Sequence, residues 1–531
     1  MDDMNLLRRG VLSDALRRAA TRYPDRVALS YHYADGRERT LTYAELGEQI
    51  ERLAAGLYAL GVRKGDRVAV VSHNAPEMVL TAYALMKLGA WFVPINFMLR
   101  SEDIAHLLHF AEPKLFFVED GLHDLVAPAL SQAPASLEQV VWISLGSDPP
   151  PSQGLRFEAL LQSSTSIPEV AIEDEDVATM FFTSGTESAP KGVLTTHRNF
   201  FASHTTFALT VGLRPEDVWL VSLPLIHMAG FDITLMAHVA GQTVVMTQLP
   251  VPRQMLALLQ HQGITLIALP PALYVALLKE ASPELTLPRM RVLMSWSSTI
   301  PQAMVDGWNR LAPNAEFLTV QGSSETTATP VTESLFRTWA EVPNRDGRWV
   351  GRPVVYGAEL KLVDEDGQEV PPGEPGEMLV RGPVVMKGYY RNPEATAKAF
   401  RDGWFHSGDV LFRDEAGNYF FADRKKDMIK TGGENVFTQE VETVIGTHPD
   451  VLQCGVFGLP DERWGEAVAV AIVVRPGKQL SEEEVRRFCR ERLAAFKVPK
   501  YIFFTDELPT TSAGKLLKRA LRERYAQSMQ A

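Results

Sequence analysis

Cysteine is scarce in this 531-residue chain, which contains only Cys454 and Cys489. Neither lies at a metal-ligand spacing from another cysteine or a histidine, so the sequence excludes a cysteine-based metal motif. Two isolated cysteines of this kind are typical of a reducing compartment. The sequence therefore predicts two reduced thiols and a cytoplasmic location.

Long apolar runs and an excess of positive charge are also lacking. The longest apolar stretch, Met78 to Pro94, is interrupted by Lys87 and Gly89, which predicts a helix followed by a strand instead of a membrane span. The N-terminus carries charges from residue 2 and has no apolar segment, which argues against a secretory signal. The formal net charge of −12 argues against a nucleic-acid partner and gives no basic stripe for a membrane surface.

The chain does have the composition of a globular protein, with 46% hydrophobic and 22% charged residues. Its length predicts two or more domains. Between about residues 41 and 320, β-branched runs alternate with helical patterns, which predicts stacked parallel α/β sheets. The predicted strands in this region are Val68–Val71, Val177–Phe182, Asp217–Leu223, Gln242–Met246, Leu266–Leu269 and Arg291–Met294. A helix through Leu88 is predicted to begin at Asn74 as its cap.

The later part of the chain has a different pattern. Turns at Asp366-Gly367 and Ala416-Gly417 predict the hairpins of a small β subdomain. Beyond it, a helix near Thr438–Ile445, two strands and a helix opening at Ser481 predict a compact α+β domain. The predicted organisation is a large N-terminal domain over residues 1–423, a hinge at 424–427, and a small mobile C-terminal domain over 428–531.

One loop carries the strongest chemical signal. The run is Phe182-Thr183-Ser184-Gly185-Thr186-Glu187-Ser188-Ala189-Pro190-Lys191-Gly192-Val193, between a predicted strand and a predicted helix from about His197. Its hydroxyls, backbone N–H groups and lysine can converge on phosphate oxygens, although it is not a Walker A loop. Taken alone, it could also be a Ser/Thr/Gly-rich surface turn, which is the less favoured alternative.

Several segments in the correct order resemble the adenylate-forming superfamily of acyl-CoA synthetases, peptide-synthetase adenylation domains and beetle luciferases. The resemblance covers nearly the whole chain. Besides the loop above, it rests on Gly65-Asp66-Arg67-Val68, Leu88-Gly89-Ala90, Val93-Pro94-Ile95-Asn96, Gln321-Gly322-Ser323-Ser324-Glu325-Thr326, Trp404-Phe405-His406-Ser407-Gly408-Asp409 and Thr511-Ser512-Ala513-Gly514-Lys515. It implies an ATP-dependent acid–CoA ligase that adenylates a fatty or other apolar acid, releases pyrophosphate, and transfers the acyl group to coenzyme A.

The resemblance implies roles for individual residues. Lys191 and the loop would hold the β- and γ-phosphates, and Glu325 would be the carboxylate associated with Mg²⁺. Asp409 would accept hydrogen bonds from the ribose hydroxyls, with Arg424 as a second ribose and phosphate contact. His227 would lie between the acyl and nucleotide sites as a gate. The remaining residues matched to nucleotide binding are Thr183, Ser184, Gly185, Thr186, Ser298, Gln321 and Ser324.

The C-terminal residues are matched to the two half-reactions. Lys515 would stabilise the charge that builds up as the acid attacks the α-phosphate. The hinge pivot matches Lys426, about which the small domain would rotate between adenylation and thioester formation. Lys430, Gly432 and Gly433 would then face the active site, where glycines let a pantetheine arm pass close to the backbone.

The acid is the least defined part of this prediction. Met228, Phe231, Met236 and Trp296 could line an apolar acyl pocket or could be ordinary core residues. The alternatives are a stand-alone enzyme that loads an amino or aryl acid onto a carrier protein, a luciferase-like oxygenase, and a non-catalytic nucleotide-binding regulator. Asp232 could pair with an amino group but is displaced from the usual place. Homodimer formation is left open.

The sequence also departs from the family pattern at four places. Glu187-Ser188 replaces Thr-Gly in the phosphate loop, and Gln321 replaces the aromatic residue that stacks on adenine. Trp296-Ser297-Ser298-Thr299 replaces Gly-Gly-Ala-Pro, and Phe437-Thr438 replaces Tyr-Pro. None of these changes falls on Glu325, Asp409, Arg424 or Lys515, so the sequence predicts an active enzyme.

Overall fold

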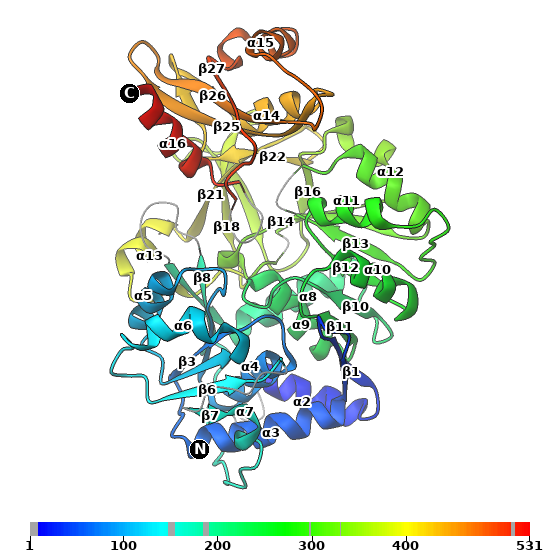
Figure 1. Cartoon of the computed structure of the whole chain (residues 1–531), viewed down its shortest axis with the longest axis vertical. Helices are drawn as coiled ribbons and strands as arrows, with labels where there is room; N and C mark the ends of the chain where they lie inside the picture. The colour runs from blue at the N-terminus through cyan, green and yellow to red at the C-terminus, as the bar shows by residue number, and fades with distance from the viewer. Residues whose placement is uncertain are drawn as a thin grey trace. The chain divides into compact units, whose positions relative to one another are not determined.

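The chain divides into two units, traced in Figure 1. The computed structural model describes residues 9–146, 154–183, 191–296, 299–329, 331–510 and 516–530. The first unit takes in Met1–Gly347, Gly351–Glu359 and Val380–Phe405, and the second takes in Arg348–Val350, Leu360–Leu379 and His406–Ala531. The chain thus leaves and re-enters each unit between residues 347 and 406. The hinge at residues 424–427 stays a prediction.

The first sheet of the first unit is parallel at its centre and antiparallel at one edge. Its strands, in spatial order, are β19 (Gly388–Tyr389), β9 (Lys191–Thr196), β8 (Val177–Thr183), β4 (Trp91–Pro94), β3 (Arg67–Val71), β5 (Leu115–Glu119), β6 (Gln139–Ile143) and β7 (Leu155–Arg156). The sequence did not predict β9, which pairs antiparallel with β8 and brings Thr183 opposite Lys191. The predicted phosphate loop therefore joins the two strands of a hairpin, and α8 follows only after β9.

The second sheet of this unit has a parallel centre of six strands. The strands in spatial order are β15 (Thr332–Phe336), β14 (Glu316–Gln321), β13 (Val292–Ser295), β12 (Leu266–Ala268), β10 (Val218–Val221), β11 (Thr243–Thr247), β1 (Val27–His32) and β2 (Glu38–Thr42). The strands from β14 to β1 run parallel, and β15 and β2 pair antiparallel at either end. Strand β16 (Trp349–Pro353) pairs with β15 through Thr332 and Pro353. The prediction of stacked parallel α/β sheets is confirmed.

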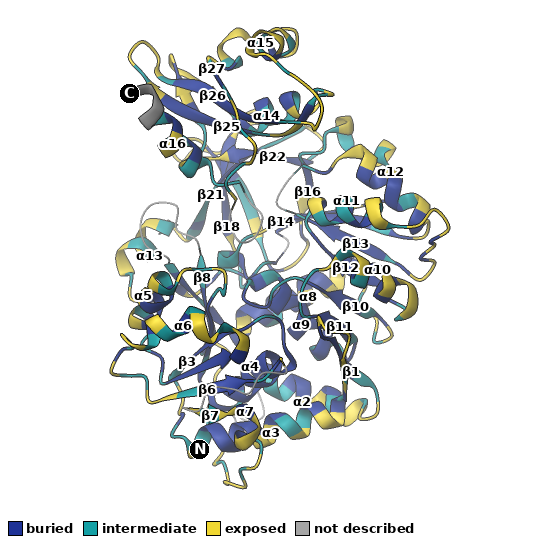
Figure 2. Ribbon diagram, in the orientation of Figure 1, coloured by how far each residue is buried: buried dark blue, intermediate teal, exposed yellow. Residues whose placement is uncertain are grey.

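Helices connect and cover these strands. They are α2 (Leu12–Arg22), α3 (Tyr43–Ala59), α4 (Pro76–Leu88), α5 (Ser101–Ala111), α6 (His123–Leu130), α7 (Phe157–Leu160), α8 (His197–Val211), α9 (Met228–Val239), α10 (Pro252–His261), α11 (Pro271–Glu280), α12 (Gln302–Leu311) and α13 (Pro393–Ala399). Helix α4 is buried on all sides except at Lys87, as its dark colour in Figure 2 shows. One apolar core includes this helix and residues of both sheets, such as Val70 and Met246. Within the described ranges, no helix is long and apolar enough to cross a membrane.

The prediction that Asn74 caps α4 is wrong. The helix begins with Pro76 in its first turn, after the extended residue Ala75, and no side chain caps it. Proline suits this position because its missing N–H would have no helical partner there. The Asn74 side chain instead donates to the Leu223 and Thr247 carbonyls and accepts from the Leu225 N–H at 2.8 Å. Asn74 therefore ties the entry of α4 to the ends of β10 and β11.

The second unit contains a small β region and a compact α+β region. The strands of the β region are β17 (Glu359–Val363), β18 (Gly376–Arg381), β21 (Trp404–Arg413) and β22 (Tyr419–Arg424), some of which begin or end in the first unit. The α+β region has β23 (Ile429–Thr431), β24 (Glu434–Val436), β25 (Val451–Asp461), β26 (Gly465–Val474), β27 (Tyr501–Phe504), α14 (Thr438–Gly446), α15 (Glu482–Arg490) and α16 (Lys518–Gln530). Ser481 and Glu484 form the predicted capping box of α15. Separate apolar clusters cover the two faces of this sheet.

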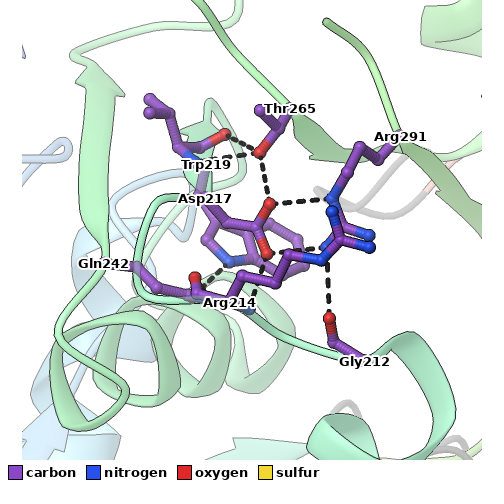
Figure 3. Close-up of polar contacts among 8 residues, drawn as sticks. Gly212, Arg214, Asp217, Trp219, Gln242, Thr265 and Arg291 are labelled. Atoms are coloured by element: carbon purple, nitrogen blue, oxygen red, sulfur yellow. Dashed lines mark hydrogen bonds and ion pairs between the residues drawn. The ribbon is translucent and has the colours of Figure 1, made fainter.

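A buried polar cluster joins the amino ends of the parallel strands in the second sheet (Figure 3). The Asp217 carboxylate, just before β10, accepts two hydrogen bonds from Arg291, at 2.9 and 2.7 Å. It also accepts from the Thr265 hydroxyl at 3.0 Å and from the Arg214 N–H at 2.8 Å. Thr265 precedes β12 and Arg291 precedes β13, so one carboxylate fixes three neighbouring strand entries. Burying an ionised carboxylate costs much free energy unless its oxygens accept hydrogen bonds, as those of Asp217 do here.

Candidate functional site

In the first unit, the predicted site residues lie where strands of the two sheets end. Thr183 is the last residue of β8 and Gln321 the last residue of β14. Ser324 and Glu325 follow in a single 3₁₀ turn, Ser324–Thr326, held by a hydrogen bond from the Ser323 N–H to the Thr326 hydroxyl. His227 occupies the N-cap position of α9, after β10. These positions match the carboxyl-end location typical of ligand sites in parallel sheets.

Tyr389 contacts both Glu325 and Lys191. The Tyr389 hydroxyl donates to Glu325 Oε1 at 3.1 Å, and Lys191 Nζ lies 5.0 Å from the centre of the Tyr389 ring. All three side chains are partly buried. Burial, together with the Glu325 carboxylate, raises the pKa of Tyr389, so the phenol stays protonated and remains a donor. The sequence predicted Glu325 and Lys191 as site residues but missed Tyr389.

The residues suggested for the acyl pocket differ in exposure. Phe231 is only 2% exposed, and its ring stacks on Phe92 with a centroid distance of 5.1 Å. Met228 is also buried, whereas Trp296 is half-buried at the end of β13. Phe231 thus has the packing of a core residue, and its role as a pocket wall stays a prediction.

Asp232 is not available to an amino group. Its carboxylate is 1% exposed and accepts from the Ser203 hydroxyl at 2.7 Å. Its other oxygen lies 3.0 Å from His204 Nε2. Because both oxygens are already bonded inside the protein, a substrate ammonium would have to displace buried partners. This arrangement does not support the amino-acid alternative.

Several predicted residues lie outside the described ranges. They are Ser184, Gly185 and Thr186 of the phosphate loop, Ser298 after β13, and Lys515 near the C-terminus. Glu187, which departs from the family pattern, also lies outside the described ranges. Their roles stay predictions from the resemblance.

In the second unit, Asp409 and Arg424 face each other across the β21–β22 hairpin. Arg424 Nε lies 3.3 Å from Asp409 Oδ1, and the Asp409 side chain is only 4% exposed. Arg424 is 45% exposed, so the rest of its guanidinium can still contact a ligand while Nε stays beside Asp409. The structure thus brings these two predicted ribose-binding residues together.

The predicted pantetheine-binding residues form the β23–β24 turn of the second unit. Gly432 and Gly433 have φ values of +60° and +88°, which favour glycine. A Cβ atom at residue 432 would lie 2.8 Å from Trp464 Cε3, so a larger residue would have to displace this ring. Trp464, which sequence reasoning missed, remains 44% exposed beside this turn. Lys430 is exposed and bonds Glu365 at 2.8 Å.

Comparison with known proteins identifies the family. A family model described as AMP-binding enzyme matches residues 16–390, and one described as AMP-binding enzyme C-terminal domain matches residues 440–515. The chain belongs to the AMP-binding enzyme family. The resemblance to adenylate-forming enzymes, read from the motifs, is therefore confirmed.

The relatives of this AMP-binding enzyme are ligases that use coenzyme A. It is 36% identical to a feruloyl-CoA synthase of Amycolatopsis sp, covering 91% of this chain and 94% of the relative. A crotonobetaine/carnitine–CoA ligase of Proteus sp. (strain LE138) is 32% identical, with 94% and 96% covered. A structure of Bacillus subtilis o-succinylbenzoate coenzyme A synthetase with ATP and magnesium ion has a TM-score of 0.81 and 29% identity, with 96% and 98% covered. The chain is an ATP-dependent acid–CoA ligase, and ATP, Mg²⁺ and coenzyme A are confirmed as its cofactor and co-substrates.

The described residues of the ligase fit a magnesium ion that arrives with the nucleotide. No group of three or more His, Cys, Asp or Glu side chains is arranged to hold a metal within those residues. Mg²⁺ usually binds through one or two carboxylates together with substrate phosphates and water. Glu325 supplies one partly exposed carboxylate, which contacts Tyr389 as Lys191 does, and the ion would neutralise phosphate charge there.

The predicted pivot of the ligase provides a test of domain rotation. Lys426 lies in a tight turn after β22, where the Arg424 carbonyl accepts from the Asp427 N–H at 2.9 Å and the Met428 N–H at 3.1 Å. Lys426→Pro should slow thioester formation at least about tenfold more than adenylation, ~1.4 kcal/mol on the barrier. The reason is that proline fixes φ where rotation requires it to change. The two half-reactions are measured separately, with Lys426→Ala as the matched control. Equal slowing of both would contradict the pivot.

Proposed function

We propose that this ligase activates an apolar carboxylic acid without an amino group, either a fatty or an aromatic acid, and transfers it to coenzyme A. The observation that supports this proposal best is the closed Asp232–Ser203–His204 cluster in α8 and α9, which leaves the Asp232 carboxylate unavailable to an ammonium group. The half-buried Trp296 offers an apolar surface at the end of β13. Among the relatives, the feruloyl-CoA synthase is named for an aromatic acid.

The proposed roles follow the chemistry of joining two anions. Lys191 and the phosphate loop bind the β- and γ-phosphates, and Glu325 binds the Mg²⁺ that accompanies them. Asp409 accepts hydrogen bonds from the ribose, because an ionised carboxylate is an acceptor with two oxygens. His227, at the start of α9, separates the acid from the nucleotide. Gln321 replaces an aromatic residue, so adenine stacking is weaker while nucleotide binding is retained.

The second half-reaction is assigned to the second unit. The positive φ values of Gly432 and Gly433 and the adjacent exposed ring of Trp464 support the β23–β24 turn as the passage for the pantetheine arm. A cytoplasmic enzyme fits the two free thiols, of which Cys489 is buried with its pKa raised to about 11 by desolvation. A carrier protein presents the same pantetheine chemistry and is the alternative acceptor.

A panel of acids tests the proposal. Purified enzyme with ATP and Mg²⁺ is given acids from acetate to palmitate, aromatic acids and amino acids, and AMP release is measured with and without coenzyme A. Apolar acids should give AMP release that depends on coenzyme A, and amino acids should give none. Activity confined to amino acids would contradict the proposed acid class. Transfer to a phosphopantetheinylated carrier protein but not to coenzyme A would contradict the proposed acceptor.

A further inference from the structure

The first unit contains a short segment that touches both predicted MgATP-binding elements. This segment, residues 384–390, includes β19, whose Gly388 and Tyr389 pair with Leu194 and Val193 of β9. Its Met386 N–H donates to the Glu325 carbonyl at 2.8 Å, and its Val384 carbonyl accepts from the Thr327 hydroxyl at 2.8 Å. The segment therefore joins the Glu325 turn to the strand that begins with Lys191.

Tyr389 is the residue of this segment whose side chain reaches both groups. Its partner in β9 is Val193, and Lys191 lies two residues earlier, on the same face of that strand because side chains alternate. The ring therefore lies within cation–π distance of the ammonium, while the hydroxyl bonds the carboxylate. In a direct ion pair, the Lys191 ammonium and the Glu325 carboxylate would bind each other. Here each group contacts a different part of the Tyr389 side chain instead.

We propose that Tyr389 is a positioning residue that holds the Glu325 carboxylate and the Lys191 ammonium in place for MgATP. This proposal rests on the proposed roles of Glu325 and Lys191. The hydroxyl bond fixes the rotamer of Glu325 through one oxygen and leaves the other oxygen for the metal ion. The ring supports the lysine without neutralising it, so its charge stays available to phosphate oxygens. Holding both groups in advance reduces the ordering cost when nucleotide binds.

The test compares nucleotide binding with and without the metal. ATP affinity is measured by calorimetry in EDTA and in saturating Mg²⁺ for the wild type, Tyr389→Phe and Tyr389→Leu. Tyr389→Phe removes the hydroxyl and keeps the ring, so it should weaken MgATP binding about tenfold and change metal-free ATP binding little. Tyr389→Leu also removes the ring and should weaken both. In steady-state assays, KM for ATP should rise in Tyr389→Phe while KM for the acid stays unchanged.

Two further variants separate the possible failures. Tyr390→Phe alters the next residue, whose ring packs on Trp91 and Phe110 instead, and should leave the Mg²⁺ dependence unchanged. Glu325→Gln should remove most of the Mg²⁺-dependent affinity. If Glu325→Gln has this effect and a folded Tyr389→Phe, checked by thermal unfolding, binds MgATP like the wild type, the positioning role is wrong. If Glu325→Gln also leaves the Mg²⁺ dependence intact, the assignment of Glu325 fails, and the role of Tyr389 fails with it.

Discussion

Replacing Lys515 with alanine should stop acyl-adenylate formation while leaving thioester formation from supplied acyl-adenylate largely intact. The lysine is proposed to stabilise the negative charge that builds up when a carboxylate attacks the α-phosphate. Loss of one such donor typically costs about 10²–10³ in rate. Pyrophosphate exchange measures the first half-reaction, and consumption of supplied acyl-adenylate by coenzyme A measures the second.

Lys515 lies outside the described residues, but the residues on either side of 511–515 are described and anchored. Thr510 and Leu516 form an isolated antiparallel bridge, so these two residues are held side by side. Two residues after Leu516, Lys518 Nζ pairs with Glu442 at 2.9 Å, and its side chain is mostly buried. Substitution of Lys518 should therefore disturb the α+β region itself, unlike substitution of Lys515.

A matched control for Lys515→Ala is Lys478→Ala, which removes an exposed lysine from the same unit. This control should leave both half-reactions unchanged, because an exposed ion pair contributes little. Equal loss of both half-reactions in a folded Lys515→Ala protein would contradict the assignment. The separation of the two rates is thus the decisive measurement, since a folding defect would lower both.

The sequence predicted the elements whose residue pattern is regular. The strands before the predicted site residues, such as β8 and β10, have runs of β-branched and apolar residues, and the structure confirms them within a few residues. The sequence did not predict β9. The predicted phosphate loop was expected to lead directly to the helix that begins at about His197. This six-residue strand takes its stability from pairing with β8 and with β19. Strand β19 begins almost 200 residues later in the chain, so the local sequence does not reveal the pairing.

The site was predicted less completely, for a similar physical reason. Glu325 and Lys191 could be found because each lies in a distinctive local run of residues. Tyr389 could not, because its two contacts reach positions 64 and about 200 residues earlier in the chain. The assignment of Asn74 as a helix cap failed because its side chain bonds distant carbonyls instead of the next turn. Contacts of this kind depend on the tertiary fold, which local patterns do not specify.

Replacing Asp217 with asparagine should destabilise the first unit without lowering the catalytic rate of the folded enzyme. The Asp217 side chain is 3% exposed and bonds Arg291 through both oxygens. Removing one partner of a buried ion pair leaves the other charge uncompensated and costs about 3–5 kcal/mol. We expect the lower end of this range, because Arg291 remains 23% exposed and can recruit water. Unfolding in urea, followed by tryptophan fluorescence, measures the loss.

The matched control is Asp35→Asn, which breaks a pair with Arg37 whose side chains are 53% and 52% exposed. Exposed pairs contribute little to stability, so this variant should unfold close to the wild type. An Asp217→Asn protein as stable as Asp35→Asn would show that the buried cluster does not stabilise the sheet.

Asp217→Asn is expected to change stability and not catalytic rate, because Asp217 and the predicted site residues lie at opposite ends of the strands. Asp217 precedes β10, whereas Gln321 is the last residue of β14 and His227 lies beyond the carboxyl end of β10. A loosened amino edge therefore lowers the folded fraction while the folded molecules keep their site geometry.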